Sequence, residues 1–283
     1  GTTGAVSAAN SLVGGTVGDG VGGYGITAFT NSIYLLRSPS WDNGAAANAG
    51  AVSLGGGVSD MTGLVSPANS VLGDVAGGGS SMTFALDASR KRLLVGYPSG
   101  NRILLQVFKG LAIRSDHGTS NPAPGARLYA EGAVLTNTAA SPDTQGTTQY
   151  VCSGWSMAGN EPASGADLSC VMTLTNDAAL TWQWRTNYWL ESAAGTNGSV
   201  TVGSGWQAKG VTTQVLAVAD LYYHFTNWTG DASSTVNPLS LLIDSPKAVT
   251  ANFAADMTTN QPTPLWWLAQ YGVSTDFEQA AQS

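Results

Sequence analysis

The chain has 283 residues, of which 43% are hydrophobic and only 10% are charged. This length is sufficient for two or three domains with cores of their own. The charged share is about half of that in an average soluble protein, and a formal net charge of −7 disfavours nucleic acid as a partner. The sequence contains neither a signal peptide nor an apolar run of about 18 residues, so we expect a mature or excised segment without a membrane span.

Glycine is unusually abundant, with 36 residues spread between short apolar runs rather than set at a fixed period. Glycine tolerates the backbone angles of tight turns, so such a chain makes many turns between short strands. A surface rich in Ser, Thr, Asn and Gly is typical of secreted β repeat proteins. We therefore predict an all-β, modular chain that is extracellular or on the cell surface.

The first third contains an internal repeat with a period of 59 residues. The run AVSAANSLVGG at residues 5–15 recurs as LVSPANSVLGD at residues 64–74, and the same shift aligns residues 35–40 with residues 94–99 without a gap. One period at two separated anchors indicates a structural repeat. Each period contains three apolar runs that we expect to be strands, at residues 25–29, 33–36 and 49–54 and at residues 82–86, 92–96 and 103–108.

Several strands in each such period are typical of a propeller blade or a β-solenoid coil. The sequence resembles the FG-GAP type of β-propeller repeat over about residues 1–109, although Val21 stands where that family has Phe. The resemblance rests on residues 18–23, 34–39 and 49–52. Some members of the family bind calcium, but residues 41–44 offer too few oxygen ligands, so we interpret them as a turn. A closed propeller needs at least about four blades, and two do not complete one.

The C-terminal half contains two diverged copies of one small β module. The first set of matches recurs after 73 residues and pairs Tyr150, Cys152 and Trp155 with Tyr223, Phe225 and Trp228. The second set recurs after 69 residues and pairs Leu174, Leu180, Thr181 and Trp184 with Ile243, Val249, Thr250 and Phe253. Because these side chains recur at matching strand positions, we expect them to form the core of each copy.

This module resembles the divergent internalin-type B-repeat, which occurs in tandem on bacterial surface proteins. The resemblance is carried by residues 198–202, 223–231, 237–239 and 247–253. It covers about residues 186–253 well and about residues 111–185 more loosely, where Cys152 and a long loop depart from the pattern. The family implies a β-rich, extracellular module that acts as a spacer, stalk or adhesive unit. It offers no catalytic residues to carry over.

We therefore expect four segments. They are two blade-like β repeats at residues 1–109, B-repeat-like β modules at residues 110–185 and 186–253, and a short helical tail at residues 254–283. Within the tail, residues 265–271 are expected to form a helix that ends at Gly272. The Thr275–Glu278 pattern predicts a capping box at the start of another helix.

The two cysteines, Cys152 and Cys170, lie on opposite sides of a polar loop between two strand-like runs. A disulfide that closes this loop is geometrically reasonable, and two buried thiols are the alternative. Trp189 and Trp206 have no counterparts in the repeat, so they are the candidates for an aromatic binding surface. Neither His117 nor His224 lies in a catalytic pattern, and we expect no catalytic residue, metal site or cofactor.

The sequence thus predicts a non-enzymatic structural or adhesive segment of a bacterial surface or filament-forming protein. It would act as a scaffold, stalk or assembly subunit, with other copies of itself or neighbouring surface domains as partners. The alternative is a carbohydrate-binding accessory region of a secreted enzyme, with glycans as ligands. An exposed row of aromatic side chains would favour the alternative, because aromatic faces stack on sugar rings.

Overall fold

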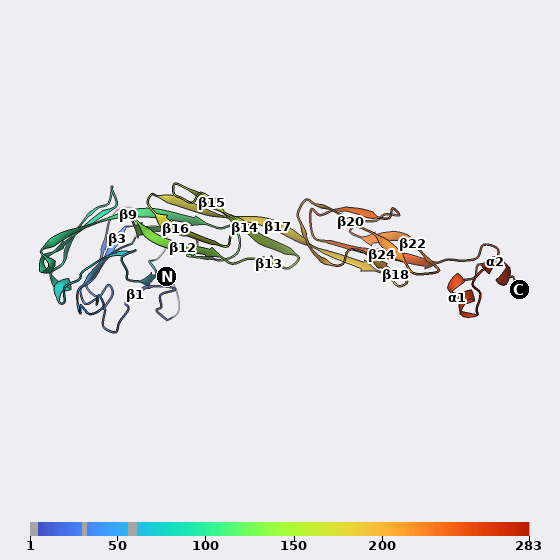
Figure 1. Cartoon of the computed structure of the whole chain (residues 1–283), viewed down its shortest axis with the longest axis horizontal. Helices are drawn as coiled ribbons and strands as arrows, with labels where there is room; N and C mark the ends of the chain where they lie inside the picture. The colour runs from blue at the N-terminus through green and yellow to red at the C-terminus, as the bar shows by residue number, and fades with distance from the viewer. Residues whose placement is uncertain (1–4, 30–32, 56–60, 283) are drawn as a thin grey trace. The chain divides into compact units, whose positions relative to one another are not determined.

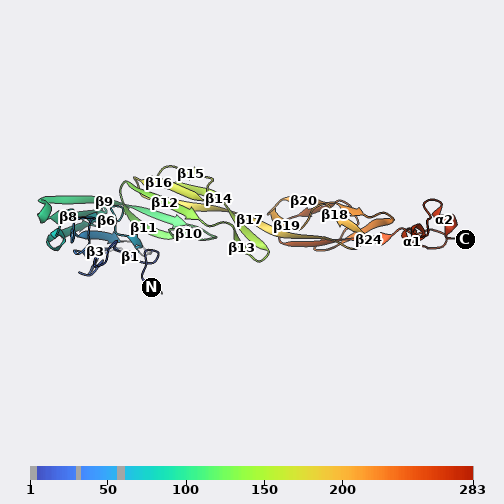
Figure 2. The same ribbon diagram turned by 60° about the horizontal axis from the view of Figure 1, so that its bottom comes forward.

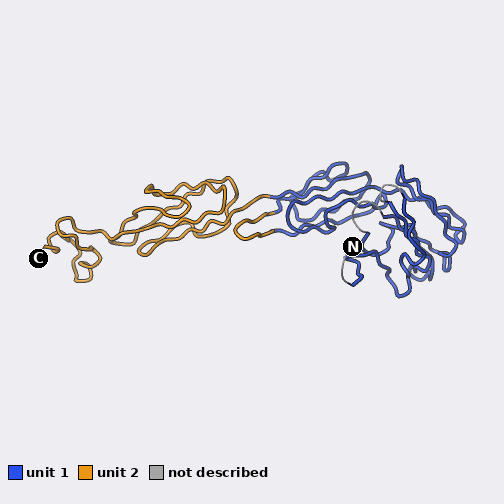
Figure 3. Tube along the Cα trace, turned by 180° about the vertical axis from the view of Figure 1, so that it is seen from behind, with its two compact units in different colours: residues 1–141, 152–184 blue, residues 142–151, 185–283 orange. Residues whose placement is uncertain are grey.

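The computed structural model describes residues 5–29, 33–55 and 61–282 (Figure 1). Figure 3 shows its two compact units: unit 1 is Gly1–Ser141 with Cys152–Trp184, and unit 2 is Pro142–Val151 with Arg185–Ser283. The described elements are mainly β-strands with two short α-helices near the C-terminus, so the all-β prediction is confirmed. The finer division into four segments stays a prediction.

The N-terminal part of unit 1 forms a four-stranded antiparallel sheet with strand order β2-β3-β4-β6. Its inward-facing side chains share a core with Leu93 and Val95 of the following hairpin. The strands are β2 Ile26–Ala28, β3 Tyr34–Ser38, β4 Ala51–Gly55 and β6 Ser70–Leu72, and β1 Leu12–Val13 pairs in parallel with β5 Gly63–Leu64.

The second expected blade does not repeat this sheet. Its strands β7, β8 and β9 pair antiparallel, and β9 then pairs with β11 and β17 in a larger sheet. The bounds are η2 Gly78–Ser81, β7 Thr83–Asp87, β8 Arg92–Tyr97, η3 Pro98–Gly100, β9 Arg102–Arg114, β11 Gly125–Ala130 and β17 Ala178–Ala194. The described residues contain no sheet that closes into a barrel. The six expected strands are therefore present, and the two sets of three are paired differently with their neighbours.

The first anchor of the 59-residue repeat is visible as a repeated turn. The Ser7 N–H donates to Asn10 Oδ1 at 2.8 Å, and the Ser66 N–H donates to Asn69 Oδ1 at 3.0 Å. Each asparagine also donates from its amide to a carbonyl five residues earlier, at 2.9 Å in both turns. The serine and asparagine of this motif therefore recur because each pair closes the same turn.

The second anchor is not structurally equivalent. It aligns Leu35 with Leu94, but Leu35 is 1% exposed and Leu94 is 39% exposed. Along β8 the buried side chains are instead Leu93, Val95 and Tyr97. A shift of one residue moves a strand's side chains to the opposite face, so the two strands present opposite patterns to the core.

A buried carboxylate, Asp19, fastens the turn at residues 18–20 to the turn at residues 41–44. It accepts hydrogen bonds from the Thr16 N–H at 2.9 Å, the Thr16 hydroxyl at 2.7 Å and the Asp42 N–H at 3.0 Å. Burial alone would raise the pKa of the Asp19 carboxyl, but these hydrogen bonds favour its charged form and leave the pKa below its usual value.

Acidification should therefore destabilise unit 1. The folded-state pKa of Asp19 lies below the unfolded value of about 3.9, so its contribution is present above that pH and lost as the pH falls through the folded pKa. The thermal midpoint of unit 1, measured by circular dichroism, should fall less over this range in Asp19→Asn than in the parent chain. Asp87, whose pKa is lowered to about 2 by hydrogen bonds from Ser89 and Arg90, titrates in both proteins. Equal pH dependence in the two proteins would contradict the assignment to Asp19.

The rest of unit 1 packs a second sheet over the larger one. The second sheet has the order β10-β12-β16 (Figure 2). Trp155 and Trp182 are buried in the shared core, together with Leu174 and Leu180. The strands are β10 Ser120–Asn121, β12 Ala133–Ala139, β14 Thr148–Ala158, β15 Ser164–Gly165 and β16 Ser169–Leu174.

Unit 2 has its own core, centred on Trp228 and surrounded by Leu190, Leu241 and Val249. Strand β24 pairs with both β17 and β22, and β20 pairs with β23. The strands are β13 Asp143–Gln145, β18 Gly198–Val200, β19 Gly205–Ala208, β20 Thr212–Val215, β21 Ala217–Ala219, β22 Tyr223–Gly230, β23 Leu239–Leu242 and β24 Lys247–Ala255.

The residues that match between the two module copies have matching burial. Trp155 and Trp228 are 6% and 0% exposed, Leu174 and Ile243 are 0% and 1% exposed, and Leu180 and Val249 are 0% and 1% exposed. The other matched pairs with an aromatic residue are also buried or half-buried: Tyr150 with Tyr223, Cys152 with Phe225, and Trp184 with Phe253. Most of the repeated aromatic and branched side chains are therefore core residues of their units, but the half-buried Tyr150 and Tyr223 are not among the residues of either core.

The C-terminal tail carries helices α1 Leu265–Gln270 and α2 Phe277–Ala280. Gly272 follows α1 with a φ of 86°, the left-handed conformation that ends a helix. The predicted capping box is wrong, because no side chain caps α2. The Glu278 carboxylate instead accepts the Thr259 N–H at 2.6 Å and the Asn260 N–H at 3.4 Å. In the part of the chain that the structure describes, no helix is long and apolar enough to cross a membrane.

Candidate functional site

The structure brings Trp189 and Trp206 together in unit 2. They lie directly opposite each other on the antiparallel strands β17 and β19. Their ring centroids are 5.3 Å apart with an interplanar angle of 75°, which is an edge-to-face arrangement. Both side chains are half-buried. The two residues that lack repeat partners therefore form one cross-strand pair.

The alternation of β17 places this pair away from the core. Leu190 and Ser192 are 0% and 8% exposed on one face of the strand. Trp189 and its neighbour Glu191 lie on the other face, because successive residues of a strand point to opposite sides. The tryptophan pair therefore belongs to the outer surface of unit 2.

Amide side chains border this surface. Asn187, two residues before Trp189 on the same face, donates from Nδ2 to Gln149 Oε1 at 3.3 Å. The backbone N–H of Trp189 donates to the carbonyl of Thr147 at 2.9 Å, which holds this edge in place. Edge-to-face packing stabilises the strand pair, and it leaves two rings at a steep angle rather than a flat platform. This geometry suits contact with one sugar ring better than with two coplanar ones.

Cys152 and Cys170 are free, buried thiols in the structure. Cys152 lies on β14 and Cys170 on β16, and both side chains enter the same core from different sheets. The Cys152 thiol donates to the Gly154 carbonyl at 3.4 Å, and burial raises the pKa of the Cys170 thiol. The structure therefore shows two buried thiols, and the loop-closing disulfide stays a prediction.

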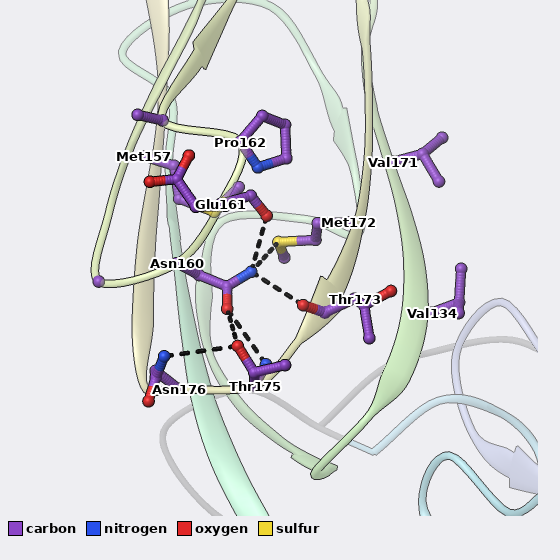
Figure 4. Close-up of a pocket in the computed structure, with 12 residues that line it drawn as sticks. Val134, Met157, Asn160, Glu161, Pro162, Val171, Met172, Thr173, Thr175 and Asn176 are labelled. Carbon is purple, nitrogen blue, oxygen red and sulfur yellow. Dashed lines mark hydrogen bonds between the residues drawn. The ribbon is translucent and has the colours of Figure 1, made fainter.

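A hollow of about 790 Å³ in unit 1 was not predicted from the sequence (Figure 4). It lies between the loop at residues 159–163 and the outer face of β12 and β16. Val134 and Val171 on that face are 69% and 57% exposed. Its lining also includes Met157, Glu161, Pro162, Met172, Thr173 and Thr175.

Asn160 joins the loop to the end of β16 at the base of this hollow, as Figure 4 shows. Its amide Nδ2 donates to the carbonyls of Glu161 and Thr173, each at 3.0 Å. Its Oδ1 accepts the Thr175 N–H at 3.1 Å and the Thr175 hydroxyl at 2.9 Å. The side chain is 8% exposed, and these contacts occupy its donors and its acceptor. Asn160 therefore fastens the loop and offers little to a ligand.

The two histidines have separate structural contacts. His117 packs edge-on against Trp184 with 6.1 Å between ring centroids. His224 Nδ1 lies 2.7 Å from Asp256 Oδ1 on the surface. Among the residues that the structure describes, no group of three or more His, Cys, Asp or Glu side chains is placed to hold a metal ion.

Comparison with protein families gives two local matches. Residues 188–257 match the divergent InlB B-repeat domain, and residues 1–23 and 28–80 match a repeat of unknown function (DUF5650). No curated protein and no solved structure matches the chain. The first match covers most of the β-strands of unit 2 and is consistent with a bacterial surface or adhesion-type region.

The N-terminal third is similar to a repeat of unknown function, and no match to the FG-GAP propeller repeat accompanies it. The propeller resemblance therefore stays a prediction. The Gly-Asp turn that suggested a propeller is explained by Asp19, which fastens two turns through its hydrogen bonds. The B-repeat resemblance, by contrast, is supported over residues 188–257.

Proposed function

We propose that the chain is an extracellular structural or adhesive segment of a bacterial surface protein, acting as a scaffold, stalk or assembly subunit. The match of residues 188–257 to the divergent InlB B-repeat domain carries this proposal. The repeat match at residues 1–23 and 28–80 supports it, because tandem repeats build extended surface structures. Other copies of the chain and neighbouring surface domains are the partners that suit this role.

The same proposal assigns no catalytic activity to the chain. The buried amide at the base of the hollow of unit 1, Asn160, is engaged in fastening a loop. The matched aromatic pairs Trp155 and Trp228, and Trp184 and Phe253, pack in the cores of the two units. These observations favour a structural role, in which the folded modules serve as building units rather than as carriers of a catalytic site.

Surface labelling tests this function. Antibodies raised against residues 188–257 should label intact cells that produce the protein, or detect it in their culture medium. A cytoplasmic enzyme released by the same lysis treatment serves as the control. A signal that appears only after lysis would contradict the proposed location.

The tryptophan pair supports carbohydrate binding as a second candidate function. Trp189 and Trp206 lie on the outer face of β17 and β19, next to the amide of Asn187. Retention of a glycan on an array should fall several-fold in Trp189→Ala and in Trp206→Ala. Trp267→Ala is the matched control, because this residue of α1 is 43% exposed and lies outside the pair. No retained glycan at millimolar concentration, or equal loss in all three variants, would exclude this function.

A further inference from the structure

In unit 2 the first and last strands of the B-repeat-like module are parallel neighbours. Strand β17 begins this module and β24 ends it, and the two pair from Leu190↔Lys247 to Ala194↔Ala251 (Figure 1). Just beyond this ladder, the Gly195 N–H donates to the carbonyl of Ala251 at 2.8 Å. The chain between the two strands therefore lies within a loop that this ladder closes.

Unit 1 contains the same arrangement. The end of β9 pairs in parallel with the start of β17, from Leu111↔Ala178 to Arg114↔Thr181. Asp177, which directly precedes β17, accepts the backbone N–H of Gly110 at 2.6 Å and the ammonium of Lys91 at 2.7 Å. A parallel ladder thus closes each of the two module copies.

The direction of these strands determines how they respond to tension along the chain. Tension enters the module of unit 2 along β17, from Arg185 onward, and leaves the module at the C-terminal end of β24. In a parallel pair, these two points lie at opposite ends of the ladder, so pulling slides one strand past the other. The inter-strand hydrogen bonds lie across this motion and are loaded together. An antiparallel pair pulled from one end instead loses its hydrogen bonds one after another.

Burial protects both ladders. In unit 2, Leu190 and Ala251 are 0% exposed and Val249 is 1% exposed. In unit 1, Leu111 and Leu180 are 0% exposed and Ile113 is 2% exposed. Separating either pair of strands therefore exposes core side chains to water in the same step, which raises the barrier to separation.

We propose that the two parallel ladders, β9–β17 and β17–β24, are mechanical clamps that keep each module folded under tension along the chain. This inference goes beyond the proposed function and does not depend on where the protein resides. The clamp of unit 2 encloses residues 190–251, and that of unit 1 encloses residues 111–181.

Single-molecule force spectroscopy of the full chain, held by its two ends, tests the proposal. Each clamp should open in one step, because the hydrogen bonds of a ladder fail together. At about 3.3–3.6 Å per extended residue, the steps should release roughly 200 Å for unit 2 and roughly 230 Å for unit 1. Rupture under force reports the unfolding barrier rather than the equilibrium stability.

A second pulling direction provides the control within the same fold. Tyr223 and Ala255 face each other at one end of the antiparallel β22–β24 pair. Pulling on tethers attached at Tyr223→Cys and Ala255→Cys should separate these two strands one hydrogen bond at a time. The rupture force should be several-fold lower than when the chain is pulled by its two ends. The native Cys152 and Cys170 are buried and do not compete for the tethers. Circular dichroism confirms that the variant is folded.

Two outcomes would overturn the clamps: equal rupture forces in the two directions, or release of unit 2 in several small steps when the chain is pulled by its ends. If the chain is absent from the cell surface but ruptures at high force, the proposed location is wrong and the clamps are supported. If the chain is on the cell surface but ruptures at low force, the clamps are wrong and the proposed location is supported.

Discussion

Replacing Trp228 with alanine is expected to lower the free energy of unfolding of unit 2 by about 3–5 kcal/mol. Trp228 is 0% exposed and forms the centre of the core of unit 2, with the Phe225 ring 5.5 Å from its own. Truncation removes the largest apolar surface of this core and leaves a cavity that the surrounding strands fill only in part. Urea denaturation followed by circular dichroism should show one transition moved to lower urea and the transition of unit 1 unchanged.

Two further variants serve as controls for Trp228→Ala. The buried indole N–H of Trp228 has no hydrogen-bond partner in the described part of the chain. Trp228→Phe therefore loses no hydrogen bond, and its ring keeps most of the apolar contact. It should cost clearly less than Trp228→Ala. Trp267→Ala, in the exposed face of α1, should leave both transitions in place. If Trp228→Ala and Trp267→Ala had equal effects, Trp228 would not be the core of unit 2.

Replacing Asn160 with alanine should destabilise unit 1 by about 2–4 kcal/mol, because each buried group left without a partner costs about 1–3 kcal/mol. The substitution removes the donors to the Glu161 and Thr173 carbonyls and the acceptor for Thr175. The loop at residues 159–163 would lose its attachment to β16. Hydrogen exchange of this loop should increase, and the urea midpoint of unit 1 should fall.

Asn176→Ala is the matched control for Asn160→Ala. Asn176 lines the same hollow but is exposed, and its side chain donates a long hydrogen bond of 3.4 Å to the Thr175 hydroxyl. Its replacement should change the stability of unit 1 by less than about 0.5 kcal/mol. If both variants had similar small effects, the amide of Asn160 would not hold the loop.

The burial of many core side chains could be predicted from the sequence because their positions recur in one polypeptide. Trp155 and Trp228, or Leu180 and Val249, match in spacing and in burial. A strand exposes one face to the core, so an alternating pattern that occurs twice fixes which side chains are inside. The same logic gave the first anchor of the N-terminal repeat, where Asn10 and Asn69 close identical turns.

Short motifs are hard to interpret where they have more than one structural use. The Gly-Asp turn suggested a propeller, and in the structure the Asp19 carboxylate accepts hydrogen bonds from the backbone N–H groups of Thr16 and Asp42, as it could in many kinds of turn. The Thr275–Glu278 spacing suggested a capping box, yet Glu278 binds backbone N–H groups at residues 259 and 260 instead. Both outcomes depend on tertiary neighbours that local spacing does not reveal.

The candidate sites illustrate the same limit. Trp189 and Trp206 were recognised because they have no repeat partners, and the register of β17 and β19 explains why they meet. Asn160 was missed, because its partners Thr173 and Thr175 lie 13 and 15 residues further along the chain. An asparagine in a polar loop gives no sequence signal that distinguishes a buried fastening residue from an exposed one.

Hydrogen exchange along β17 shows most directly whether this one strand completes a clamped β core in each unit. Its first residues pair with β9 in unit 1 and its last residues pair with β24 in unit 2. We expect the amides of residues 178–181 and 190–194 to exchange only through global unfolding of their own unit, as slowly as the most protected amides there. Exchange of either segment at the rate of the surface loops would contradict it.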